Sequence, residues 1–311
     1  MSRHSDCSMY SASRGGFRRG WRLLIVLASA SVVGCQQSAT IGPVAQEEQA
    51  RKIAEAFASA SADAGGDEAG DEAGGTGWAT LKGRIVFVGD PPEMPPYNAT
   101  KDMATCAPGG TAPPQEWLIV GDDGGLANVA IYARKVSRVH ESAEPPEEEV
   151  VFDQKQCVFL SHVCPIVIGQ TVMIKNSDPV GHNTNVQGQN AFNQTVPADG
   201  STPYEPQREE SSPAKVTCSI HPWMVSYMLP RENGYVSVTG KDGAFELANL
   251  PAGETIEIQV WHESAPGGAV IAEGETADRL GWTNKGRFKI KLEEDQTEEI
   301  TIQVPASALS G

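Results

Sequence analysis

Residues 236–261 read Val-Ser-Val-Thr-Gly-Lys-Asp-Gly-Ala-Phe-Glu-Leu-Ala-Asn-Leu-Pro-Ala-Gly-Glu-Thr-Ile-Glu-Ile-Gln-Val-Trp. Polar and apolar residues alternate over most of this stretch, as in antiparallel strands with one buried face, and glycine-containing turns divide it. We place no long helix after residue 77 and no strand in the polar stretch 187–213. The sequence therefore predicts an all-β, sandwich-type fold. Similar short runs lie at 81–88, 117–120, 126–132, 150–152, 157–160, 165–168, 171–175, 214–217, 287–292 and 299–304.

One segment gathers three side chains that bind metals. Cys218-Ser219-Ile220-His221-Pro222-Trp223-Met224 follows directly on the run 214–217 and offers a thiolate, an imidazole and a thioether at three-residue intervals. Soft sulfur ligands together with imidazole favour copper. A loop between two strands can turn all three side chains toward one point. We expect a second imidazole from His182, on the loop that leaves the run 171–175.

This pattern resembles the blue-copper proteins, or cupredoxins, and especially the amicyanin type with its short ligand loop. Gly169-Gln170-Thr171-Val172-Met173-Ile174-Lys175-Asn176, followed by His182-Asn183, resembles the family's strand and loop for the first histidine ligand. The resemblance covers roughly 150–240 and implies a cupredoxin Greek-key sandwich with one type 1 copper ion. It implies the metal ligands His182, Cys218, His221 and, as weak axial ligand, Met224. Asn183 would help to tie the two ligand loops together. The chain departs from the family at 179–181 and 187–213.

Other interpretations of these residues stay open. Met228 is an alternative axial ligand, but residues 227–229 read as the strand after the loop, so we favour Met224. Any one of the four residues alone is more often structural: a buried thiol, a surface turn or a core methionine. Cys157, His162 and Cys164 are zinc-type ligands that lack a fourth partner. His140 and His262 have no comparable setting.

A second resemblance concerns the flanking segments. Residues 238–253, with the hairpin signal Asp242-Gly243 and the turn Leu250-Pro251-Ala252-Gly253, resemble the carboxypeptidase regulatory-like (transthyretin-type) β-sandwich. We expect residues 78–149 and 236–306 to fold together as this sandwich, with the copper domain, 150–235, inserted between them. The alternative is a tandem of two or three separate β-domains.

The N-terminus reads as a leader and a spacer. Residues 1–34 combine Arg18-Arg19, an apolar run at 23–28 and small residues, as signal peptides do. Val32-Val33-Gly34-Cys35 resembles a bacterial lipobox, which implies a membrane anchor through lipid on Cys35. An ordinary signal peptide or an uncleaved anchor is the alternative. Residues 35–77 are acidic and glycine-rich, which predicts a disordered tether.

The net charge limits the expected binding partners, and the number of cysteines limits the expected disulfides. The 311-residue chain has a net charge of −16, and 19 basic against 39 acidic residues remain from Cys35 onward, a net charge of −20. Nucleic acid is therefore not expected as a partner. Four cysteines follow Cys35 in an oxidising compartment. With Cys218 as a metal ligand, the other three form at most one disulfide, and we pair Cys106 with Cys157.

These features predict an electron carrier outside the cytoplasm that exchanges single electrons with protein redox partners, docking near Pro222 and Trp223. We expect no enzyme activity and no small-molecule substrate, because no hydrolase, nucleotide-binding or zinc-protease motif occurs. Six histidines are too few for a multicopper oxidase. The alternatives are a copper storage or delivery protein and a metal-free structural β-sandwich lipoprotein.

Overall fold

The computed structural model describes residues 77–309, and nearly all of its regular structure is strand, which confirms the predicted all-β fold. The predicted leader and all of the predicted tether except Gly77 lie outside the described residues. The strands are β1 (Trp78–Val88), β2 (Ala130–Ala133), β3 (Val150–Lys155), β4 (Val158–Phe159), β5 (Val163–Val167), β6 (Val172–Asn176), β7 (His182–Gln187), β8 (Phe192–Val196), β9 (Ser201–Tyr204), β10 (Ala214–Thr217), β11 (Val225–Arg231), β12 (Val236–Val238), β13 (Ala244–Pro251), β14 (Thr255–Trp261), β15 (Arg287–Lys291) and β16 (Thr297–Pro305).

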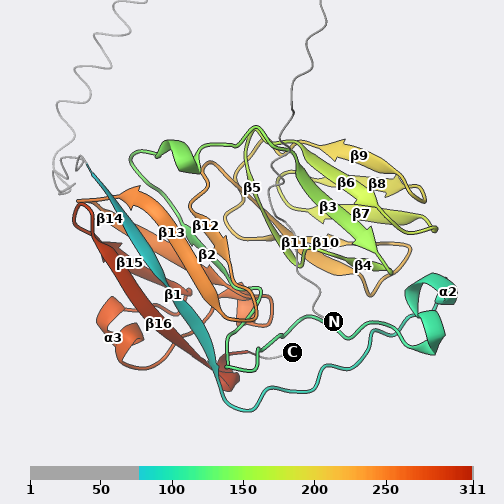
Figure 1. Cartoon of the computed structure of the whole chain (residues 1–311), viewed down its shortest axis with the longest axis horizontal. Coiled ribbons are helices and arrows are strands. Elements are labelled where there is room, and N and C mark those ends of the chain that lie inside the picture. Colours follow the sequence, from blue (N-terminus) through green and yellow to red (C-terminus); the bar gives the residue numbers. More distant parts are fainter. Residues whose placement is uncertain (1–76, 310–311) are drawn as a thin grey trace, which may run out of the picture. The chain divides into compact units, whose positions relative to one another are not determined.

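Two sheets combine strands from both ends of the described chain. One has the order β13-β1-β16, and the other has the order β12-β2-β14-β15. Figure 1 shows β1, near residue 80, beside β13 and β16, which follow more than 150 residues later. Alternate residues of these strands point into one shared core, which includes Ile85, Phe245, Ile258, Phe288 and Ile302. Burying each such side chain stabilises the fold by about 1.5–3 kcal/mol.

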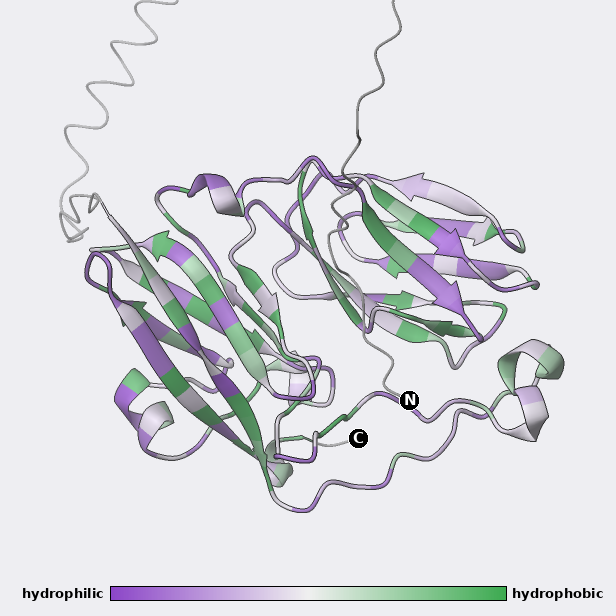
Figure 2. Ribbon diagram, in the orientation of Figure 1, coloured by the Kyte–Doolittle hydropathy of each residue, from purple (hydrophilic) through white to green (hydrophobic). Residues whose placement is uncertain are grey.

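A second pair of sheets is built only from residues 150–231. Its orders are β5-β11-β10-β7-β8 and β4-β3-β6-β9. Phe152 and Ile174 from one sheet and Val186, Val216 and Met228 from the other share a buried core. In Figure 2, hydrophobic and hydrophilic residues alternate along many of the strands, as expected where one face is buried and the other is not. The predicted loop residue His182 is instead the first residue of β7.

Three strand predictions need correction. The run 117–120 forms no strand and makes only the bridge from Val120 to Leu126. Of the run 126–132, only residues from Ala130 onward belong to a strand, because Asn128 has a left-handed backbone (φ 61°) that interrupts it. The polar stretch 187–213 is not strand-free, since β8 and β9 lie within it. Each of these strands has only one buried side chain, so hydrophobic alternation does not reveal them.

The helices are minor elements. They are α2 (Met103–Cys106), α3 (Glu275–Leu280) and 3-10 turns at Pro108–Gly110, Glu141–Ala143, Pro266–Gly268 and Ala306–Ala308. Within residues 77–309, no helix has the length and apolar character needed to cross a membrane. The predicted disulfide between Cys106 and Cys157 is confirmed, and it attaches α2 to the segment between β3 and β4.

Candidate metal centre

The hairpin formed by β10 and β11 holds the ligand loop. Thr217 pairs with Val225, so residues 218–224 form the loop between the two strands. Two backbone hydrogen bonds close it: Met224 N–H donates to the His221 carbonyl at 2.9 Å, and Cys218 N–H donates to the Met224 carbonyl at 3.3 Å. The three predicted ligand side chains of this loop are 0–2% exposed. The register therefore brings them to one end of the second core.

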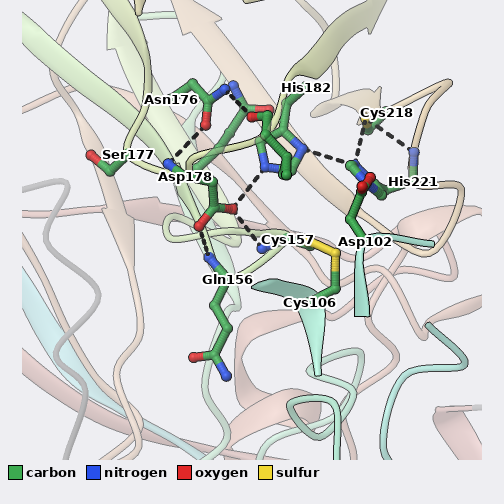
Figure 3. Close-up of polar contacts among 12 residues, drawn as sticks. Asp102, Cys106, Gln156, Cys157, Asn176, Ser177, Asp178, His182, Cys218 and His221 are labelled. Carbon is green, nitrogen blue, oxygen red and sulfur yellow. Dashed lines mark hydrogen bonds and ion pairs between the residues drawn. A yellow bond between two sulfur atoms is a disulfide. The ribbon is translucent and has the colours of Figure 1, made fainter. Parts of the chain in front are cut away.

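The second histidine reaches the same place from β7. This strand pairs with β10, with Asn185 opposite Thr217, so its first residue, His182, lies beside the start of the ligand loop. The Nδ1 atoms of His182 and His221 are 2.9 Å apart, and the Cys218 Sγ is 3.9 Å from the His221 Nδ1 (Figure 3). Ligand atoms of these three residues lie within 4.8 Å of one another. Two imidazole nitrogens and one thiol thus converge in a buried space.

Asn183 connects the two segments that carry the predicted ligands. Its backbone N–H donates to Cys218 Sγ at 3.3 Å, and its side-chain oxygen accepts the N–H of Ser219 at 3.2 Å. Its amide group donates to the side chain of Asn193 and to the carbonyl of Gln194, both on β8. The role that the resemblance implied for this residue, tying the two ligand segments together, is confirmed by these bonds.

Two carboxylates, which the sequence reasoning missed, hold the far edges of both rings. His182 Nε2 lies 2.7 Å from an oxygen of Asp178, and His221 Nε2 lies 2.8 Å from an oxygen of Asp102 (Figure 3). Each ring therefore presents its Nδ1 atom to the site. Asp178, four residues before His182, could have been suspected from its position. Nothing in the sequence points to Asp102, which is 119 positions from His221.

The buried contacts set the protonation of the site. Burial raises the pKa of the Cys218 thiol, but hydrogen bonds from His182 and from the N–H groups of Asn183 and His221 outweigh it, and the pKa falls below its ordinary value. Burial likewise opposes a charged His182 ring. Hydrogen bonds to Asp178 and Cys218 nevertheless raise its pKa to about 9. Both shifts favour the charged forms, a thiolate on Cys218 and an imidazolium on His182.

The pKa of His221 is shifted in the opposite direction, below its ordinary value. Burial lowers its pKa, the positive charge of His182 lowers it further, and the bond to Asp102 does not offset these effects. A neutral His221 carries its proton on Nε2, toward Asp102, so its Nδ1 is free to accept a hydrogen bond or a metal. Asp178 is also buried, but its bonds from His182 and from the N–H groups of Cys157 and Gln156 hold its pKa below the usual range.

The donor set fits a copper ion. Two imidazoles and a thiolate are the three strong ligands of blue-copper sites, which add a weak axial thioether. Met224 is 1% exposed and belongs to the same buried cluster as Cys218. Met228 also belongs to that cluster, but it lies inside β11 and pairs with Ala214. The zinc alternative loses a ligand, because the sulfur of Cys157 is in a disulfide.

Comparisons with known proteins return copper proteins among solved structures. A copper-containing nitrite reductase from Thermus scotoductus SA-01 is 22% identical over 30% of this chain and 25% of its own, with a TM-score of 0.26. Amicyanin from Paracoccus versutus is 19% identical over 32% of this chain and 97% of its own, with a TM-score of 0.25. A purple cupredoxin from Nitrosopumilus maritimus is 22% identical over 26% of this chain and 96% of its own, with a TM-score of 0.23.

No protein-family model matches the chain, and no curated protein matches it either. The chain spans only a quarter of the length of the nitrite reductase. Because all these TM-scores are low, the functional assignment depends on the side chains of the site.

Proposed function

We propose that His182, Cys218 and His221, with Met224 as weak axial ligand, hold one type 1 copper ion, and that the chain carries single electrons between protein redox partners. The observation that carries the proposal is the convergence of two Nδ1 atoms and one Sγ in a buried space. Bound copper supplies a reversible one-electron couple. The protein supplies a rigid ligand set, because the backbone of the loop and both outer ring nitrogens are already hydrogen-bonded.

The burial of the ligands favours electron transfer over substrate chemistry and over metal delivery. All four proposed ligands are at most 2% exposed, so a substrate has no direct access to the ion. A delivery protein must also release its metal to a partner, which buried ligands hinder. Electrons, in contrast, can pass through the edge of a ligand ring. We therefore propose that the chain is not an enzyme.

The surface next to His221 is the proposed contact for redox partners. Pro222 is exposed, and Trp223 is half-buried, with its ring centroid 5.2 Å from that of His221. The Trp223 indole N–H donates to the carbonyl of Cys157 at 3.1 Å, which fixes the ring beside the site. Attachment to a membrane through lipid on Cys35, outside the cytoplasm, stays a prediction from the leader sequence.

Electrochemistry on the copper-loaded full chain tests the proposed function. We expect one reversible one-electron wave and no loss of copper over repeated cycles. Replacing Met224 by Leu should raise the reduction potential, because a lost thioether donor destabilises Cu(II) more than Cu(I). The matched change Met228→Leu should leave the potential nearly unchanged. Release of copper on each reduction would favour storage or delivery, and a chain that retains no copper would favour the metal-free structural alternative.

A further inference from the structure

Both proposed histidine ligands are held by carboxylates that come from outside the ligand loop. Asp178 contacts the Nε2 of His182 at 2.7 Å, and Asp102 contacts the Nε2 of His221 at 2.8 Å. A carboxylate that accepts the outer N–H of an imidazole fixes the orientation of the ring and makes its other nitrogen a stronger donor. The stronger donor nitrogen favours the more highly charged metal state, because added electron density stabilises Cu(II) more than Cu(I).

Asp178 is rigidly held. It is 3% exposed, and its two oxygens accept the N–H groups of Gln156 at 2.6 Å and Cys157 at 2.8 Å. The oxygen bonded to Cys157 is the same one that contacts His182. Its own N–H donates to the side chain of Asn176 at 3.0 Å. The position of the His182 ring therefore depends on the backbone of Cys157.

Asp102 depends on a short element that cannot hold it alone. It precedes α2 and has a left-handed backbone (φ 47°), and its carbonyl accepts the N–H groups of Thr105 and Cys106. Isolated helices as short as α2, with four residues, are unstable in water. The Asp102 side chain is 41% exposed, so burial does not fix it either. The covalent bond from Cys106, which is fully buried, keeps α2 in place.

The disulfide joins the two carboxylate supports. Cys157 is bonded to Cys106, at the end of the element that carries Asp102, and donates its N–H to Asp178. The two disulfide sulfurs and a ring nitrogen of His221 lie within 4.8 Å of one another. The Cys157 sulfur, an Asp178 oxygen and a ring nitrogen of His182 do the same. The Cys106–Cys157 bond thus lies close to both histidine rings (Figure 3).

We propose that Asp102 and Asp178 are positioning residues that lower the reduction potential of the metal centre, and that the Cys106–Cys157 disulfide keeps Asp102 on His221. This inference rests on the proposed copper function and adds the control of its potential. The three groups act through the imidazoles and do not themselves bind the metal.

The test compares reduction potentials and Cu(II) affinities of full-chain variants. Asp102→Asn and Asp178→Asn should each raise the potential and weaken Cu(II) binding by about 10- to 100-fold, the usual effect of losing such an outer partner. Asp123→Asn is the matched control, because Asp123 is a surface carboxylate that is paired with Arg84 and lies outside the sheets of residues 150–231. Its potential should equal that of the unchanged chain.

The role of the disulfide is tested by a double-mutant cycle. The chain with Cys106→Ser and Cys157→Ser should have a raised potential, and adding Asp102→Asn to it should change the potential much less than Asp102→Asn does alone. Full additivity would show that the disulfide does not act through Asp102. Unchanged potentials in both aspartate variants, in a chain that still shows a copper–thiolate site, would overturn this inference and leave the proposed function standing.

A measurement on the unchanged, metal-free chain tests the same contacts without any variant that could fail to fold. Nitrogen-15 spectra of the imidazoles should show His182 and His221 both protonated on Nε2, as donors to carboxylates. A His221 ring protonated only on Nδ1 would contradict the inference without any substitution.

Discussion

Replacing Arg231 by Ala should lower the free energy of unfolding by about 3–5 kcal/mol, the range seen when one partner of a buried ion pair is removed. Arg231 is 2% exposed and ends β11. Its guanidinium donates to the carbonyls of Ala133, Arg134 and Glu210 at 2.9–3.0 Å and lies 2.8 Å from a carboxylate oxygen of Glu209. The Ala variant leaves these carbonyls and this carboxylate without their donor.

The matched control is Arg279→Ala. Arg279 on α3 also pairs with a carboxylate, that of Glu298 at 3.0 Å, but its side chain is 54% exposed. Exposed pairs contribute about 1 kcal/mol or less, so this variant should be nearly as stable as the unchanged chain. Denaturant unfolding measures both changes. Equal losses in the two variants would show that Arg231 stabilises the fold no more than an exposed arginine does.

Arg231 also connects the two buried cores, and its removal can show how the chain divides into domains. β11 belongs to the sheets of 150–231, and the carbonyls of Ala133 and Arg134 belong to the other sandwich. We propose that residues 78–149 and 236–306 form one domain, into which the domain 150–235 is inserted. In support, β1 pairs with β13 and β16. In the Arg231→Ala chain, calorimetry should resolve two transitions. Separate melting of 78–149 and 236–306 would instead indicate tandem domains.

Cu(II) affinity should rise about tenfold for each pH unit between pH 7 and about 9, and then level off, because metal ligands must lose their protons to bind. Below its pKa of about 9, His182 carries the proton that the ion must displace from Nδ1. The lowered pKa of Cys218 reduces the contribution of this thiol to the slope. His221, with its lowered pKa, is already neutral in this range.

Competition with a chelator of known pH dependence measures this slope. In Asp178→Asn the hydrogen bond and the negative charge that raise the pKa of His182 are lost. The affinity should therefore stop rising at a lower pH than in the unchanged chain. The matched surface change Asp123→Asn should leave the profile where it is. A Cu(II) affinity that stays constant from pH 7 to 9 would contradict the view that His182 is a ligand and must lose a proton when the ion binds.

Local patterns predict much of this molecule. Strands with one buried face, such as β13 and β14, show the period-two alternation that their packing requires, so the all-β fold could be predicted. The spacing of Cys218, His221 and Met224 within one loop is likewise visible in the sequence. In contrast, β8 consists mainly of exposed residues that are held by backbone pairing to β7, and such pairing leaves no hydrophobic pattern.

The features of the site that the sequence does not predict depend on contacts between distant positions of the chain. Asp102 contacts His221 from the start of α2, which a disulfide attaches to Cys157, and no spacing rule connects positions so far apart. Asp178 is closer to its partner, but its carboxylate is oriented by N–H groups of Gln156 and Cys157 on another segment. The electrostatics of the site therefore had to come from the structure, although three of its proposed ligands are evident in one short loop.

Visible absorption and electron paramagnetic resonance of the full chain with one equivalent of Cu(II) test the copper site most directly. We expect an intense blue absorption and a narrow copper hyperfine splitting, both lost in Cys218→Ala and both kept in Cys164→Ala, a second buried thiol in the same core. A chain that retains no copper, or a colour that survives in Cys218→Ala, would contradict a thiolate-bound type 1 site at this position.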